Sequence, residues 1–148
     1  MATPTLVLIV HALATCMMAG VIWFVQVVHY PLFNAVGEES FTEYETRHQS
    51  RTGVIVGPLM LVELATAILL LAMVPAGVPR WMPLVGLVML ALVWLSTFGV
   101  QVPLHQKLSR GFDARAHGVL VATNWGRTFL WTARGVLALL MLKASTNA

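Results

Sequence analysis

Four long apolar stretches, each long enough to cross a membrane as a helix, dominate this 148-residue chain. A spanning helix needs about 20 mostly apolar residues. The stretches are Leu6–Val28, Val54–Val74, Met82–Val102 and Val119–Leu142. Only 10% of the residues are charged, against about 25% in a soluble domain. This composition argues against a soluble enzyme, a disordered chain and a nucleic-acid partner, and it predicts an integral membrane protein that contacts the lipid bilayer.

Prolines separate the stretches, because proline disrupts the interior of a helix. Pro31 is expected to end the first helix, the Pro75–Pro79 turn to separate the second from the third, and Pro103 to close the third. We therefore predict an all-α fold, a single four-helix transmembrane domain over residues 1–148, with a homo-oligomer as its expected assembly.

Two longer connections, Phe33–Gly53 and Leu104–Gly118, fall on the same side of such a bundle. In the first, Phe41, Tyr44 and His48 recur at helical spacing among charged residues, which predicts a short amphipathic helix. Cytoplasmic connections are rich in Lys and Arg. We therefore expect a bacterial-type inner membrane, with the long connections in the cytoplasm and both termini outside. The cations counted on the long-connection side are Arg47, Arg51, Lys107, Arg110, Arg115 and Arg127, against Arg80 and Lys143 opposite.

The two halves of the chain also show a weak parallel repeat, each half being a helical hairpin. Val25-Gln26-Val27 precedes Pro31-Leu32, and Val100-Gln101-Val102 precedes Pro103-Leu104. Further on, a His48-x-x-Arg51-Thr52 sequence parallels Asn124-x-x-Arg127-Thr128. Such halves would be related by an axis along the membrane normal.

Polar residues inside spanning helices usually face the bundle interior. His29, His48 and His105 are predicted to meet at one end as metal ligands for iron, copper or zinc. Glu45 or Asn124 would complete or orient this ligand set, because Glu45 and His48 form a Glu-x-x-His pair on one helical face. The alternative is that these histidines only anchor helix ends in the headgroup region.

Glu63 and Arg134 lie near the middle of their stretches, which predicts a buried ion pair. Arg127 is predicted to bind substrate, and Arg127 or Arg134 could hold a carboxylate or propionate of a substrate or cofactor. His11 is alone in the first stretch. It is either a hydrogen-bonded packing residue or an axial ligand of haem.

Several short sequences resemble a known family. They are His11, Trp23-Phe24, Pro31-Leu32-Phe33, the charged segment ending in Arg51, Gly57-Pro58-Leu59-Met60, Lys107-Leu108-Ser109-Arg110-Gly111 and Asn124. Over most of its length the chain distantly resembles the small four-helix bacterial membrane family that contains the haem-binding protoporphyrinogen oxidase, and the related copper-resistance-type membrane domains. The resemblance implies a haem b ligand at His11. The family's functional lysine in the third helix has no counterpart, since Val85, Gly86 and Leu87 stand there, so that reaction is not transferred.

Three functions are compatible with these residues. The first is a membrane oxidoreductase or oxygenase that uses a histidine-bound metal or haem on a hydrophobic small molecule. The second is a non-enzymatic membrane subunit, structural protein or sensor. The third is a small oligomeric transporter, in which Glu63 would be the proton or cation site.

Overall fold

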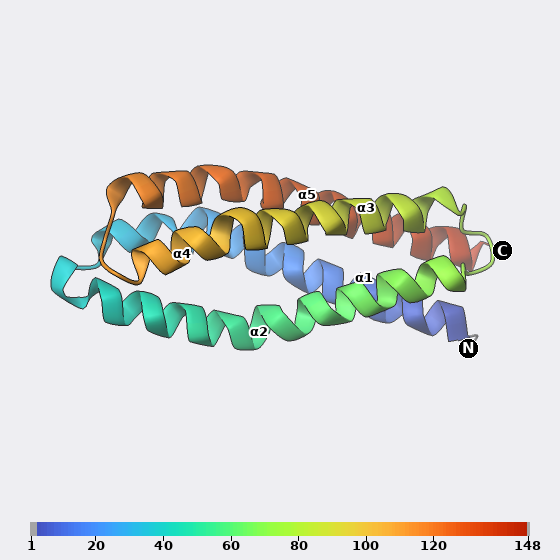
Figure 1. The fold of residues 1–148 in the computed structure, drawn as a ribbon. Coiled ribbons are helices and arrows are strands. Elements are labelled where there is room, and N and C mark those ends of the chain that lie inside the picture. Colours follow the sequence, from blue (N-terminus) through green and yellow to red (C-terminus); the bar gives the residue numbers. More distant parts are fainter. Residues whose placement is uncertain (1–2, 148) are drawn as a thin grey trace.

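The chain folds as a bundle of four long helical segments in the computed structural model, which describes residues 3–147 (Figure 1). No strand occurs among these residues, so the all-α prediction is confirmed. The elements are α1 (Thr3–Phe24), the π-helical turn η1 (Val25–His29), the 3-10 turn η2 (Pro31–Ala35), α2 (Glu38–Ala72), α3 (Trp81–Ser96), the π-helical turn η3 (Thr97–Gln101), α4 (Val102–Leu108) and α5 (Ala114–Thr146).

The segments pack as a ring. The helix α1 packs against α2 and α5, and α3 packs against the same two helices. Both chain termini lie at one end of the bundle, and the η2–α2 and α4–α5 connections lie at the other (Figure 1). We call the second end the connection end. One apolar cluster around Phe33, Phe41 and Trp131 extends from this end, and a second around Leu8, Leu70 and Met141 packs separately.

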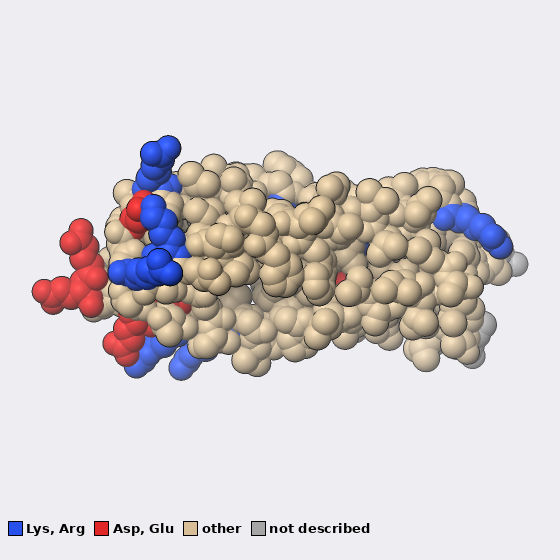
Figure 2. Space-filling model, viewed as in Figure 1, with Lys and Arg blue, Asp and Glu red and all other residues tan. Residues whose placement is uncertain are grey.

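The outer surface suits a lipid environment. Three segments, Thr3–Ala35, Glu38–Ala72 and Trp81–Leu108, are long and apolar enough to cross a membrane. Their outward faces carry large apolar side chains such as Leu13, Val54 and Leu95. Most charged side chains in view lie at the two ends of the molecule (Figure 2). The fourth predicted stretch lies in α5, which is not among these three segments and contains two buried arginines.

The predicted bounds of both long connections are wrong. The amphipathic segment around His48 is not a separate short helix, because α2 runs without a break over 35 residues and includes Pro58. The second long connection, predicted as Leu104–Gly118, comprises only residues 109–113. The other residues of the predicted range belong to α4 and α5.

Pro103 does not close the third helical segment. In the π-helical turn η3, the Val102 N–H donates to the Thr97 carbonyl, five residues back. Pro103 then falls in the first turn of α4, where no backbone N–H is required. The extra residue in the turn therefore lets the segment continue past the proline to Leu108. Pro31 is accommodated in the same way, in the first turn of η2 after the π-helical turn η1.

Candidate metal centre

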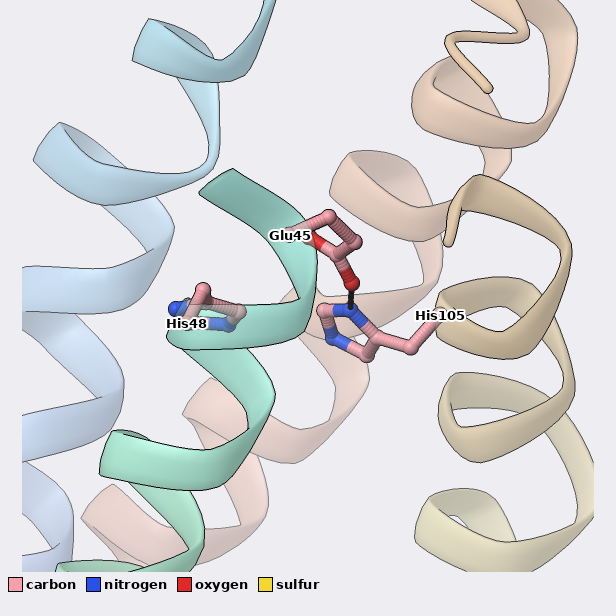
Figure 3. Close-up of side chains that lie close together, drawn as sticks. All are labelled: Glu45, His48 and His105. Carbon is pink, nitrogen blue, oxygen red and sulfur yellow. Dashed lines mark hydrogen bonds and ion pairs between the residues drawn. The ribbon is translucent and has the colours of Figure 1, made fainter. Parts of the chain in front are cut away.

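Glu45, His48 and His105 come together near the connection end of the bundle. Glu45 and His48 lie one turn apart on α2, and His105 reaches them from α4 (Figure 3). One ligand atom from each residue lies within 4.8 Å of the other two. We call these three residues the Glu-His-His cluster. Its donor set, two imidazoles and one carboxylate, is suitable for a transition metal such as zinc, copper or iron.

The Glu45 carboxylate is the most unusual member because it is completely buried. Its Oε1 lies 2.5 Å from His105 Nδ1 and accepts a second hydrogen bond of 3.1 Å from the Gln49 amide. Its Oε2 is buried without a hydrogen-bond partner. A buried carboxylate oxygen with no partner is energetically unfavourable. A cation at this oxygen would remove that penalty, so the residues present fit a metal.

The two imidazoles differ in how their nitrogens are engaged. The hydrogen bonds of His48 within the described chain both involve Nδ1, at 2.7 Å from His29 Nε2 and 3.1 Å from Thr52 Oγ1. Its Nε2 is therefore the nitrogen available to a metal. In His105 both nitrogens are engaged, since Nε2 lies 2.8 Å from the Tyr30 hydroxyl. A metal shared with Glu45 would bind His105 through Nδ1, the nitrogen that faces Glu45, and Nε2 would keep its contact with the Tyr30 hydroxyl.

His29, predicted as a metal ligand, lies beside the cluster. Its Nε2 contacts His48 Nδ1, and its ring centroid is 4.5 Å from that of His48. The residues whose ligand atoms lie within 4.8 Å of one another are Glu45, His48 and His105, so Glu45 and not His29 is the third member of the cluster. His29 is therefore positioned to fix the orientation of the His48 ring, as residues hydrogen-bonded to a ligand commonly do.

Asn124 and Arg127 form a neighbouring network on α5. The Asn124 amide donates to Gln26 Oε1 at 2.8 Å and accepts from Arg127 Nη1 at 3.1 Å. Within residues 3–147, Asn124 makes no hydrogen bond to a histidine. The reason is that Gln26, buried in the π-helical turn η1, takes the Asn124 amide.

Two apolar cavities adjoin the cluster. The first, of about 200 Å³, is lined by apolar side chains of α1 and α2 and by the polar side chains of Tyr30, His48, His105 and Arg127, among others. The second, of about 620 Å³, lies between α1 and α2 and is lined by His29, His48 and apolar residues such as Phe24 and Ile55. We call them the inner cavity and the groove. Because His48 lines both, a ligand in either one reaches the cluster.

Further along the bundle, Glu63 and Arg134 form an ion pair of 3.0 Å, and both side chains are essentially inaccessible. Arg134 also donates to the Gly86 carbonyl, and the Trp131 indole donates to the second Glu63 oxygen at 2.9 Å. His11 contacts the Thr66 hydroxyl through Nδ1 at 2.8 Å. Its surroundings match the packing interpretation, and it lines neither the inner cavity nor the groove.

Sequence reasoning missed Tyr30, Gln26, Gln101 and His117 as parts of this region. His117 is buried and lies 2.7 Å from the Tyr30 carbonyl through Nε2. Gln26 and Gln101 were visible in the repeated Val-Gln-Val sequence but were not assigned a role. Both are buried in π-helical turns and bond to α5, Gln101 through the Thr123 hydroxyl.

Comparison with protein-family models, with curated proteins and with solved structures gives no match for this chain.

Proposed function

We propose that this chain is a membrane metalloprotein of the oxidoreductase or oxygenase class, with a transition metal bound by the Glu-His-His cluster and a hydrophobic molecule as substrate. The observation that carries this proposal is the buried Glu45 oxygen without a partner, held beside two imidazoles. Two histidines and one carboxylate are the ligand set of non-haem iron oxygenases, and they also suit zinc and copper.

The residues around such a metal would have separate roles. Glu45, His48 and His105 would hold the metal. His29, at His48 Nδ1, and the Tyr30 hydroxyl, at His105 Nε2, would fix the orientation of the two rings. Asn124 would orient the Arg127 guanidinium, which would bind the substrate. The metal, when bound, would supply Lewis-acid or redox chemistry.

The membrane placement is part of the proposal. We infer that all four helical segments cross a bacterial-type inner membrane, with the connection end in the cytoplasm. Three segments have the length and hydropathy for this, and α5 would join them because its two buried arginines face the bundle interior.

The proposal is tested by the metal content of protein purified without a histidine tag. We expect near-stoichiometric iron, copper or zinc in the wild type and loss of that metal in the double variant H48A/H105A. The variant H117Q provides a matched control, since it alters a buried histidine at the same end outside the cluster. It is expected to keep the metal. Wild-type metal content in H48A/H105A would show that the cluster is not the site.

One observation favours the non-enzymatic alternative. The bonds between His29 and His48, and between Tyr30 and His105, satisfy these side chains without any metal. A purely structural network predicts protein that is metal-free after exposure to iron, copper and zinc salts. It also predicts an unfolding temperature that chelators and added metal leave unchanged. The metalloprotein predicts a rise in the unfolding temperature when metal is added, because a ligand that binds only the folded state stabilises it.

A further inference from the structure

Arg127 and Arg134 are both buried cations on α5, but only one has a counter-charge. Arg134 is paired with Glu63. Arg127 is 6% exposed and forms no ion pair with any carboxylate of residues 3–147. Its Nη1 donates to the neutral Asn124 amide, and its Nε is buried with no hydrogen-bond partner. A buried charge without a counter-charge is strongly unfavourable. An anion bound beside Arg127 would remove this cost.

Arg127 borders a space that could hold that anion. Arg127 lines the inner cavity, in which Tyr30, His48 and His105 are also wall residues. Its guanidinium carbon lies 5.1 Å from the centroid of the Trp131 ring, and this stacking restricts its direction. The groove adjoins the inner cavity, because the two share the wall residues Val21, Val25, His48, Thr52 and Val56.

We propose that the inner cavity binds a hydrophobic carboxylate, with its carboxylate group on Arg127 and its apolar chain in the groove between α1 and α2. One unpaired positive charge matches a singly charged anion. A guanidinium also matches a planar carboxylate, which can accept two hydrogen bonds from it. This inference deepens the proposed function, since it names the substrate class of the same site.

The groove has two other arginines, which are weaker anchors for the anion. Arg47 and Arg51 line it near the connection end, and both are exposed. Arg47 already forms an ion pair with Glu43. Because exposed cations remain hydrated, they gain little from an additional ion pair. A carboxylate held at Arg127 would also place the adjoining carbons of the ligand in the inner cavity, which His48 and His105 line.

Binding of two ligands of equal chain length tests this site. Octanoate and 1-octanol are titrated by calorimetry into detergent-solubilised protein at pH 8, after metal has been removed with EDTA. We expect the wild type to bind octanoate about tenfold or more tightly than 1-octanol, because only octanoate can pair with a buried guanidinium. R127Q should abolish this preference, and R127K should retain part of it. R51Q tests the alternative anchor in the groove and should keep the preference for octanoate. R115Q removes an exposed arginine that lines neither the inner cavity nor the groove, and it is the control expected to bind as the wild type does.

Equal affinity of the wild type for the two ligands would overturn the proposal. So would a preference that survives in R127Q, or one that disappears in R51Q. If R127Q does not fold, R127K decides, since an ammonium group cannot replace the two-pronged contact and an undiminished preference contradicts the site. Because metal is absent, octanoate binding tests Arg127 alone. Protein that prefers octanoate, but that is isolated without metal and takes none up from added iron, copper or zinc salts, would refute the metal centre but not the carboxylate site.

Discussion

Glu63 and Arg134 are buried among apolar helices, and each compensates the charge of the other. Both side chains are at most 1% exposed. Removing one member of such a pair leaves an uncompensated buried charge, at a cost of about 3–5 kcal/mol. We therefore expect E63L to lower the free energy of unfolding by about that amount, measured by denaturant unfolding in detergent with far-ultraviolet circular dichroism.

The double variant E63L/R134M is the matched control for this pair. It removes both charges and leaves the Trp131 indole without its acceptor, just as E63L does. Because apolar side chains can replace a buried ion pair at little cost, E63L/R134M should be more stable than E63L. An E63L protein as stable as the wild type would show that the pair does not hold the two helices together.

The position of a residue along its helix explains which contacts could be predicted from the sequence. Glu63 and Arg134 each lie near the middle of an apolar stretch, so counting residues was enough to set them at one level. The Glu-x-x-His spacing likewise put Glu45 and His48 on one face. The partners of Tyr30 and Gln26 could not be derived in this way. They depend on how η1 turns relative to α2 and α5, which a periodic pattern does not encode.

At the scale of elements, Asp113 caps the start of α5 in the connection that follows α4. Its carboxylate accepts from the Ala116 N–H at 2.8 Å and contacts the Lys107 ammonium at 2.5 Å. The hydrogen bond from Lys107, and then that from the Ala116 backbone, hold the pKa of Asp113 below its ordinary value of 3.8. A carboxyl with a lowered pKa in the folded state contributes stability above its unfolded pKa, and this contribution is lost as the pH falls through the folded pKa.

We therefore expect D113A to unfold at a lower temperature than the wild type at pH 7, and the difference to shrink at pH 3 and below. Thermal unfolding of both proteins in detergent at the two pH values measures this. D113N keeps an acceptor for the cap but loses the charge, so it should lie between them at pH 7. The same wild-type advantage over D113A at both pH values would show that the charge of Asp113 contributes nothing.

The helices themselves were predictable where apolar stretches are long, and their ends were not. Pro103 is predicted to stop a helix because proline lacks the N–H that an α-helix needs for the hydrogen bond to the carbonyl four residues back. The π-helical turn η3 removes that conflict by adding one residue before the proline. The amphipathic segment around His48 is predicted as a separate short helix because its charged residues lie in the connection between two apolar stretches. In the structure, the continuous helix α2 contains both this charged segment and the apolar stretch that follows it.

At the scale of the whole molecule, the charges are divided unequally between the two ends. The connection end carries the exposed cations Arg47, Arg51, Lys107, Arg110 and Arg115. The end with the termini carries Arg80, directly before α3, and Lys143, in the last turn of α5. Arg127, which the sequence count included at the connection end, is buried and does not contribute. The remaining five cations against two still favour a cytoplasmic connection end.

In the proposed orientation both termini lie outside the cytoplasm, since they lie at the same end of the bundle (Figure 1). We expect alkaline phosphatase fused to the C-terminus to be active in bacterial cells, because its disulfides form only in the oxidising periplasm. Green fluorescent protein at the same position should be dark. Fusions after Arg110, in the α4–α5 connection, should give the opposite pattern. Fluorescent C-terminal fusions with inactive phosphatase would mean that the bundle is inserted the other way. The Glu-His-His cluster and the groove arginines would then lie towards the periplasm.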